Sequence, residues 1–284
     1  MVNESRAAPP RHRLRPTRRG RLVMLIGAVL VLAAAVLVPL LVLGSDEEKE
    51  KAQPRSLVIP EGWRASQVYE AADKALGLAP GSTEKAVPTA ELSLPDAAGG
   101  NPEGYLFPAT YPVDEDTTPA SLLRYMVDTA VKRFGADHIT AGAERNSVSV
   151  YQTVTIASVV QAEADTVSDM GKVARVVYNR LAQDMALQMD STLNYALKRS
   201  TLDTTTGDTK IDSPYNSYER KGLPPTPIGN PGEQAMQAAI SPPPGPWLYF
   251  VTVGPGDTRF TDSYDEQLTN VEEFNRNRSS ATAG

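Results

Sequence analysis

The sequence contains no cysteine and only two histidines, His12 and His138, among its 284 residues. Without cysteine, neither a disulfide framework nor a thiolate metal site can form, so packing must stabilise the fold. Two histidines also argue against a histidine-based triad or a multi-histidine metal site, and we expect no metal and no cofactor. Aspartate and glutamate must therefore carry any acid–base chemistry.

Basic residues are scarce beyond the first 21 positions. Residues 1–21 hold seven arginines against one acid, Glu4. After residue 43, by contrast, 33 acidic residues oppose 21 basic ones, a net charge of −12. Because nucleic acids are bound by clusters of lysine and arginine, we expect no nucleic acid partner for the main part of the chain.

One stretch has no charge at all. Residues 22–43 are 22 apolar residues, which at about 1.5 Å each span the ~30 Å hydrocarbon core of a bilayer. Arginines precede this stretch and the acidic run 46–48 follows it, which predicts a cytoplasmic N-terminus and an extracytoplasmic remainder. The alternative is a cleaved signal peptide, whose apolar region is usually shorter. We expect a retained single-pass anchor in the cell membrane.

Periodicity and turn residues divide the chain into segments and predict an α+β fold. The segments are a cytoplasmic basic tail (1–21), a transmembrane helix (22–43), a linker (44–55), a small unit with a connector (56–102) and a main domain (103–284). The expected strands are 56–59, 104–113, 247–253 and about 259–261. The expected helices are 63–76, 118–134, 147–164, 168–183, 190–197, 230–240 and a last one with the capping box Ser263-x-x-Glu266. Residues 199–229 show neither period, and such long loops are often binding loops.

Glu163 is the candidate catalytic residue. It shares one face of the predicted helix 147–164 with Ile156, Val159 and Val160. Apolar neighbours and a position in the last helical turn would both raise its pKa, because each disfavours the anion. A carboxyl that is protonated near neutral pH can act as a general acid.

The spacing alone also allows a purely structural role for Glu163. A glutamate at a helix end can extend its carboxylate into water, or it can pair with Lys172 or Arg175 of the next helix.

Five motifs follow one another along the chain, and this ordered set is more specific for a protein family than any single motif. They are Ile156-Ala-Ser-Val-Val-Gln-Ala-Glu163, Val176-Val-Tyr-Asn-Arg-Leu181, Leu187-Gln-Met-Asp-Ser-Thr192, Ser213-Pro-Tyr-Asn-Ser-Tyr218 and Gly222-Leu-Pro-Pro-Thr-Pro-Ile-Gly-Asn-Pro-Gly232. Together they resemble the YceG-like family of endolytic murein transglycosylases, also called MltG, over residues 103–275. Residues 57–62 and the helix after them are similar to the small LysM-like unit of that family.

The resemblance implies cleavage of the β-1,4 bond between N-acetylmuramic acid and N-acetylglucosamine within peptidoglycan strands, leaving a 1,6-anhydro-muramyl end. Glu163 matches the family's catalytic glutamate. It would protonate the leaving oxygen and then accept the proton of the sugar's 6-hydroxyl, so one carboxyl suffices where ordinary glycosidases need two. The implied partners are glycan strands, the membrane and cell-wall synthases (penicillin-binding proteins).

The same motifs supply candidate substrate-binding residues: Gln188, Asp190, Thr192, Tyr215, Asn216, Tyr218 and Asn230. Each has a structural alternative. Asp190 or Thr192 can cap a helix, Asn216 can stabilise a turn beside core tyrosines, and Asn230 before Pro231 is by default an N-cap.

One departure from the family pattern concerns the number of acidic residues near Glu163. Many members carry a second glutamate two positions before the catalytic one, where this chain has Gln161. Two alternatives to transglycosylation stay open. One is a catalytically inactive, membrane-tethered peptidoglycan-binding or scaffold protein; the other is a muramidase-type hydrolase with a second carboxylate such as Asp165 or Asp190 at about 5–9.5 Å from Glu163.

Overall fold

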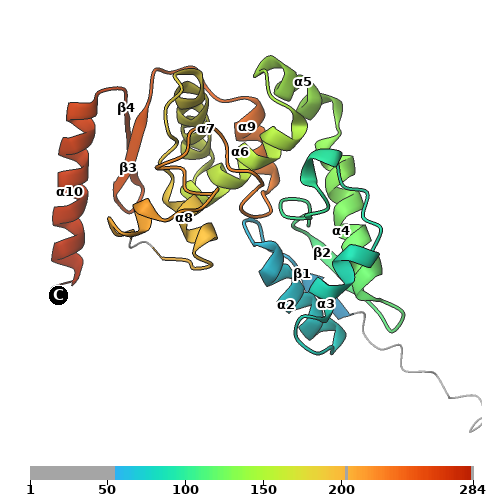
Figure 1. The fold of residues 1–284 in the computed structure, drawn as a ribbon. Coiled ribbons are helices and arrows are strands. Elements are labelled where there is room, and N and C mark those ends of the chain that lie inside the picture. Colours follow the sequence, from blue (N-terminus) through green and yellow to red (C-terminus); the bar gives the residue numbers. More distant parts are fainter. Residues whose placement is uncertain (1–54, 202–203, 283–284) are drawn as a thin grey trace, which may run out of the picture. The chain divides into compact units, whose positions relative to one another are not determined.

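The computed structural model describes residues 55–201 and 204–282, which are mostly helical with two small antiparallel sheets (Figure 1). In chain order the longer elements are β1 (Arg55–Val58), α2 (Ala65–Leu76), α3 (Ser82–Ala86), β2 (Thr110–Val113), α4 (Pro119–Phe134), α5 (Asp137–Arg145), α6 (Val150–Glu163), α7 (Val167–Ala182), α8 (Asp190–Ala196), α9 (Glu233–Ile240), β3 (Tyr249–Gly254), β4 (Asp257–Thr261) and α10 (Tyr264–Thr282). Short 3-10 turns lie at Val87–Thr89, Asp96–Ala98 and Asp208–Lys210. The α+β prediction is confirmed in this helix-rich form.

The first part of the fold has its own hydrophobic cluster. Strands β1 and β2 pair antiparallel, with Leu57 opposite Tyr111. Both side chains pack with α2 and with the buried face of α4, which contributes Leu123 and Met126. The cluster therefore extends past residue 102, where the sequence placed a boundary, because β2 closes the sheet that β1 begins. The connector after α2 is also more helical than expected.

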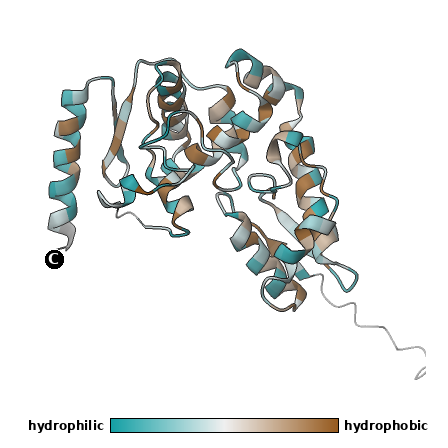
Figure 2. Ribbon diagram, viewed as in Figure 1, coloured by the Kyte–Doolittle hydropathy of each residue, from teal (hydrophilic) through white to brown (hydrophobic). Residues whose placement is uncertain are grey.

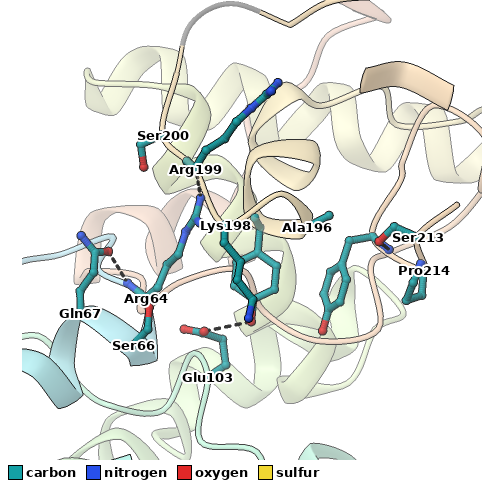
Figure 3. A pocket seen from close by; sticks show the side chains of 12 residues that line it. Arg64, Ser66, Gln67, Glu103, Ala196, Lys198, Arg199, Ser200, Ser213 and Pro214 are labelled. Carbon is teal, nitrogen blue, oxygen red and sulfur yellow. Dashed lines mark hydrogen bonds between the residues drawn. The ribbon is translucent and has the colours of Figure 1, made fainter. Parts of the chain in front are cut away.

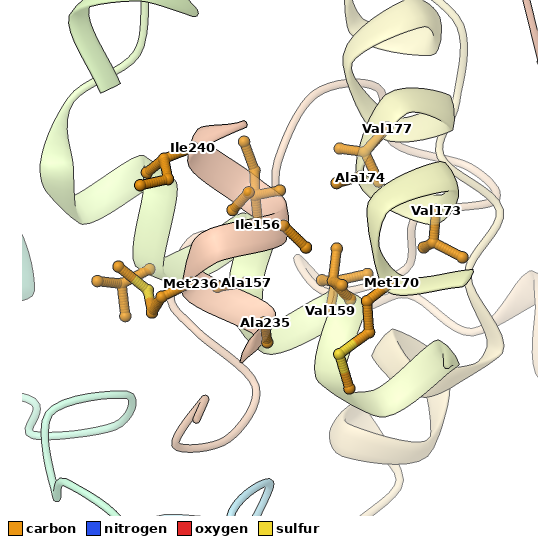
Figure 4. Packing of buried hydrophobic residues seen from close by; sticks show 14 of the residues in the cluster. Ile156, Ala157, Val159, Met170, Val173, Ala174, Val177, Ala235, Met236 and Ile240 are labelled. Carbon is orange, nitrogen blue, oxygen red and sulfur yellow. The ribbon is translucent and has the colours of Figure 1, made fainter. Parts of the chain in front are cut away.

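The second cluster forms where α6, α7 and α9 pack together (Figure 4). Every residue of α6 from Thr153 to Val160 is buried, so this helix is covered on all sides. Two of its buried polar side chains bond within the helix: Thr155 donates to the Tyr151 carbonyl, and Ser158 donates to the Thr155 carbonyl. A fully packed α6 gives the residue at its C-terminal end a rigid position.

The N-cap residues of the helices can be compared with those predicted from the sequence. Thr118 caps α4 as expected, with a reciprocal bond to Ser121. The predicted cap Ser147 of α6 is wrong, because Ser149 accepts the cap bond while Ser147 has a positive φ of 56°. The cap of α7 is Thr166 rather than Ser168 or Asp169. A helix from Asp137, α5, was missed, although the chain turns before and after it.

The C-terminal part is a hairpin covered by one helix. Strand β3 pairs antiparallel with β4, and α10 packs along β3. The capping box expected before α10 forms in part: Glu266 donates its backbone N–H to Ser263, whereas its carboxylate accepts from Thr261. Figure 2 shows α10 as mainly hydrophilic and the helices of the second cluster as more hydrophobic.

The predicted transmembrane segment, residues 22–43, lies outside the described residues. Among those that the structure does describe, no helix combines the length and apolar character needed to cross a bilayer.

Candidate active site

Glu163 is the last residue of α6. Ala164 has extended backbone angles, φ −144° and ψ 138°, so the helix ends there and a short corner leads to α7. The Glu163 residue is partly exposed, and its Oε1 accepts a hydrogen bond of 3.1 Å from the backbone N–H of Ser191 in the first turn of α8. The carboxyl is thus held between two helices rather than left free at a helix end.

Burial raises the pKa of the Glu163 carboxyl above its usual value. The backbone N–H of Ser191 acts in the opposite direction because it stabilises the anion, and the nearby negative charge of Asp190 adds to the upward shift. A carboxyl that is easily protonated but has a donor for its ionised form can exchange a proton in both directions.

The structural explanation of Glu163 as an ion-pair partner is wrong for the two cations considered. Arg175 donates to the carbonyls of Pro242 and Pro243. The Lys172 ammonium lies 5.0 Å from the centre of the Phe260 ring. Arg175 thus binds the segment after α9 and Lys172 lies against the C-terminal hairpin, so neither pairs with the carboxyl.

Asp190 and Tyr218 form the next layer of the site. The Tyr218 hydroxyl donates to Asp190 Oδ1 at 2.6 Å, which joins the start of α8 to the loop 213–218. Burial raises the pKa of Tyr218, and its bond to Asp190 adds to this, so the phenol stays a donor. The described residues contain no group of three or more acidic or histidine side chains arranged to hold a metal ion.

Gln188 is exposed and is held in an unusual conformation. Its φ is +52°, which non-glycine residues rarely adopt. Its Oε1 accepts from Arg180 at 3.1 Å, and this places the side-chain amide nitrogen as the end available to a ligand. Arg180 is itself buried and donates to three backbone carbonyls as well, those of Ala186, Leu187 and Leu248.

Three predicted substrate-binding residues are buried, with no side-chain surface facing solvent. Thr192 donates to the Met189 carbonyl, and Asn216 donates to two carbonyls of its own loop, those of Thr209 and Ile211. Asn230 receives Leu106 N–H at 2.7 Å and donates to the Trp63 carbonyl at 2.8 Å. In this conformation all three stabilise the backbone around the site, because their polar side-chain groups form hydrogen bonds within the protein.

The predicted N-cap role of Asn230 is also wrong, since α9 begins at Glu233 with Gly232 as its N-cap residue. Gln161, at the position of the family's second glutamate, lies next to this point and accepts the Gly232 backbone N–H at 3.0 Å. A side-chain oxygen at position 161 therefore supports the start of α9.

Tyr215 is half-buried and lies beside Tyr195, with ring centres 4.9 Å apart. The Tyr195 hydroxyl donates to Glu103 at 3.0 Å. Sequence reasoning missed Glu103, Tyr195, Arg180 and Ser191. For Arg180 there was a signal, because it follows Val173 and Val177 at helical spacing and so had to lie on the apolar face of α7.

A half-buried helix-end glutamate, held by α8 and bordered by a tyrosine-bearing loop, defines a candidate acid–base site with one central carboxyl. A family model described as the YceG-like family matches residues 34–273, and the chain belongs to this family.

Two curated proteins with similar sequences support the assignment to this family. An endolytic murein transglycosylase of Bacillus subtilis is 37% identical over 176 residues, which cover 61% of this chain and 48% of the relative. One from Streptococcus pneumoniae is 32% identical over 257 residues, 81% of this chain and 46% of the relative. The chain therefore spans about half the length of these curated relatives.

A solved structure is also similar. The crystal structure of a YceG-like protein from Listeria monocytogenes superposes with a TM-score of 0.67 at 28% identity, covering 80% of this chain and 79% of that one.

Proposed function

We propose that this chain is an endolytic lytic transglycosylase that cuts the bond between N-acetylmuramic acid and N-acetylglucosamine inside nascent peptidoglycan strands, terminating or trimming their elongation. The observation that carries the proposal is the Glu163 carboxyl, which burial makes easier to protonate while Ser191 N–H supports its anion. Family membership and the names of the relatives support the same reaction class.

The proposed reaction needs Glu163 in both protonation states. As an acid it gives its proton to the glycosidic oxygen while the bond from the anomeric carbon to that oxygen breaks. As a carboxylate it then takes the proton of the 6-hydroxyl, whose oxygen bonds to the anomeric carbon. Glu163 ends protonated, water is not consumed, and the product is a 1,6-anhydro sugar. Polar groups of exposed Gln188 and of the half-buried residues Asp190, Tyr215 and Tyr218 would orient the sugars around this exchange.

The proposal includes the place of the reaction. The apolar segment 22–43 and the arginines before it favour a single anchor, with the catalytic part outside the cell membrane and near the synthases that make new strands. The LysM-like character of the small unit stays a prediction.

A hydrolase is the second candidate, because Asp190 lies near enough to affect the Glu163 pKa. The two reactions differ in their products: hydrolysis leaves a reducing end, whereas transglycosylation leaves an anhydro end.

The test is mass spectrometry of the products after the full chain, in detergent, is incubated with uncrosslinked glycan strands. We expect internal cuts with 1,6-anhydro ends from the wild type and a loss of about 10²- to 10⁴-fold in Glu163→Gln. Glu272→Gln is the matched control, because it makes the same chemical change on exposed α10. Reducing ends would favour the hydrolase, and intact strands with the wild type would favour a binding or scaffold protein.

A further inference from the structure

A cavity of about 610 Å³ lies beside the candidate site (Figure 3). Its walls come from the start of α2, from Glu103, from the end of α8 with the residues after it, and from the loop at Tyr215. Figure 3 shows Arg64 and Gln67 on one side and Ser213 and Pro214 on the other, with Glu103 between. A volume of this size fits a ligand larger than one small ion.

The cavity is one turn of α8 away from the Glu163 carboxyl. Glu163 does not line it, but the carboxyl is bonded to Ser191, and Tyr195 in the cavity wall follows four residues later. Residues four apart are separated by about 6 Å along the helix axis. A chain of sugars that places one linkage at Glu163 and runs along α8 would therefore bring a neighbouring unit to the cavity.

The interior of the cavity suits a sugar ring. The rings of Tyr195 and Tyr215 lie side by side in its wall, and aromatic faces of this kind pack against apolar ring faces. Glu103 is 4% exposed, and its oxygens accept from the backbone N–H of Ala65 and from the Tyr195 hydroxyl. These bonds fix the position of Tyr195 relative to α2.

The rim of the cavity is basic, unlike the rest of the chain after residue 43. Arg64, Lys198 and Arg199 line it, against the one carboxyl of Glu103. The Arg64 guanidinium lies 5.3 Å from the centre of the Tyr195 ring and donates to the Arg199 carbonyl, while Lys198 is exposed. Arg199 is paired with Asp208 at 2.7 Å. Arg64 and Lys198 are therefore the cations best placed for an anionic ligand group.

We propose that this cavity binds a muramyl unit adjacent to the cut bond together with its stem peptide. The sugar ring packs on Tyr195 and Tyr215, and free carboxylates of the peptide pair with Arg64 and Lys198. The inference rests on the proposed function and adds a substrate preference to it: strands that keep their stem peptides bind more tightly than strands without them. It also assigns part of substrate recognition to Arg64 in the small unit.

The test measures binding rather than cleavage. The full chain carrying Glu163→Gln, in detergent, is titrated with two labelled pools of matched length: strands with stem peptides, and the same strands after an amidase has removed the peptides. We expect the added change Arg64→Gln with Lys198→Gln to weaken binding of peptide-bearing strands about tenfold and of bare strands less than about twofold. Arg276→Gln with Lys132→Gln is the control, because it removes the same two charges at exposed positions of α10 and α4 and should leave both affinities unchanged.

Two results would overturn the inference: equal weakening for both pools, or unchanged affinity for the peptide-bearing pool. Lys198→Gln alone guards against misfolding, because this side chain is exposed, and it should show a smaller loss of the same selectivity. Cleavage by the otherwise wild-type chain is measured in parallel. Selective binding without anhydro products would contradict the proposed reaction alone, whereas anhydro products without selectivity would contradict the cavity assignment alone.

Discussion

Two features of the surrounding structure have opposite effects on the pKa of the Glu163 carboxyl. Packing at the end of α6 partly shields it from water and disfavours the anion, whereas the backbone N–H of Ser191 stabilises the anion. The balance between them decides how readily the residue gives and takes a proton. Because Ser191 is the second residue of α8, its backbone N–H is not needed within the helix and can be altered separately from the fold.

This separation gives a prediction for the pH dependence of the reaction. The acid form of Glu163 starts the cut, so kcat/KM should fall as the pH rises through the raised pKa. Ser191→Pro removes the N–H that stabilises the anion, so the alkaline limb should move to higher pH, whereas Ser191→Ala keeps the N–H and should leave the limb near its wild-type position. The measurement is the pH–rate profile of anhydro-product formation, with Ser279→Ala on α10 as the control. An unchanged limb in Ser191→Pro would contradict this role of Ser191.

Glu103 provides a prediction about stability. Burial raises its pKa from 4.5 to about 7, against the effect of its bonds from Ala65 and Tyr195. Its contribution to stability is therefore complete below pH 4.5 and is lost as the pH rises through about 7, by up to about 3 kcal/mol. Glu103→Gln keeps the shape and cannot ionise, so its melting temperature relative to the wild type should increase from pH 5 to pH 8.

The measurement for Glu103 is thermal unfolding followed by circular dichroism at several pH values, on the full chain in detergent. Glu272→Gln serves as the control, because it makes the same chemical change on the exposed side of α10. A melting difference for Glu103→Gln that stays constant between pH 5 and pH 8 would rule out this titration as a source of stability.

Close packing between α5 and α9 depends on a glycine. A Cβ added at Gly142 would overlap the Ile240 side chain, with Cγ2 at 3.0 Å, although the backbone at Gly142 does not have positive φ. Gly142→Ala should therefore destabilise the fold by about 1–3 kcal/mol, since the two helices must separate. Denaturant unfolding of the variant checks this. Gly254→Ala is the control, because its Cβ meets nothing within 4 Å, and an equal loss there would point to a general effect of alanine.

Helices with local signals could be predicted from the sequence, and elements defined by distant partners could not. Thr118 and Pro119 mark the start of α4 in the sequence. The apolar face of α7, visible from its helical spacing, includes its buried arginine. The caps of α6 and α7 were misplaced because several serine, threonine and aspartate residues stand near each start, and the final choice depends on where the helix packs. Propensity distinguishes such neighbours poorly.

The candidate site divides in the same way. Glu163 could be predicted, since an acid on an apolar helix face is visible in the spacing. Asn230 could not, because its side-chain partners, Leu106 and Trp63, are 124 and 167 residues away. The sequence shows an asparagine before a proline, which has a good local explanation, and only the fold reveals that the side chain ties separate segments together.

Asn230 joins the part of the fold that carries Arg64 to the part that carries Glu163. Its backbone exchanges hydrogen bonds with the turn at Gly62 and Trp63, and its side chain adds bonds to Trp63 and Leu106. Gly229 lies close beneath the same turn, where a Cβ would come within 2.8 Å of the Gly62 carbonyl oxygen. The two hydrophobic clusters are thus connected by a tight polar joint, and the cavity between Arg64 and Tyr195 depends on it.

The last prediction follows from this joint. Asn230→Ala leaves the Leu106 N–H and the Trp63 carbonyl without their side-chain partner in a buried place, so we expect a loss of about 2–4 kcal/mol. The loss should be greatest where the small unit meets the rest. In hydrogen exchange followed by mass spectrometry, amides of β1 and α2 should therefore exchange faster, while those of α6 keep most of their protection. Asn277→Ala is the matched control, because it removes a single bond to the Val253 carbonyl in the C-terminal hairpin. If β1, α2 and α6 lose protection equally in Asn230→Ala, the two clusters unfold as one unit and the joint is not the weak point that its geometry indicates.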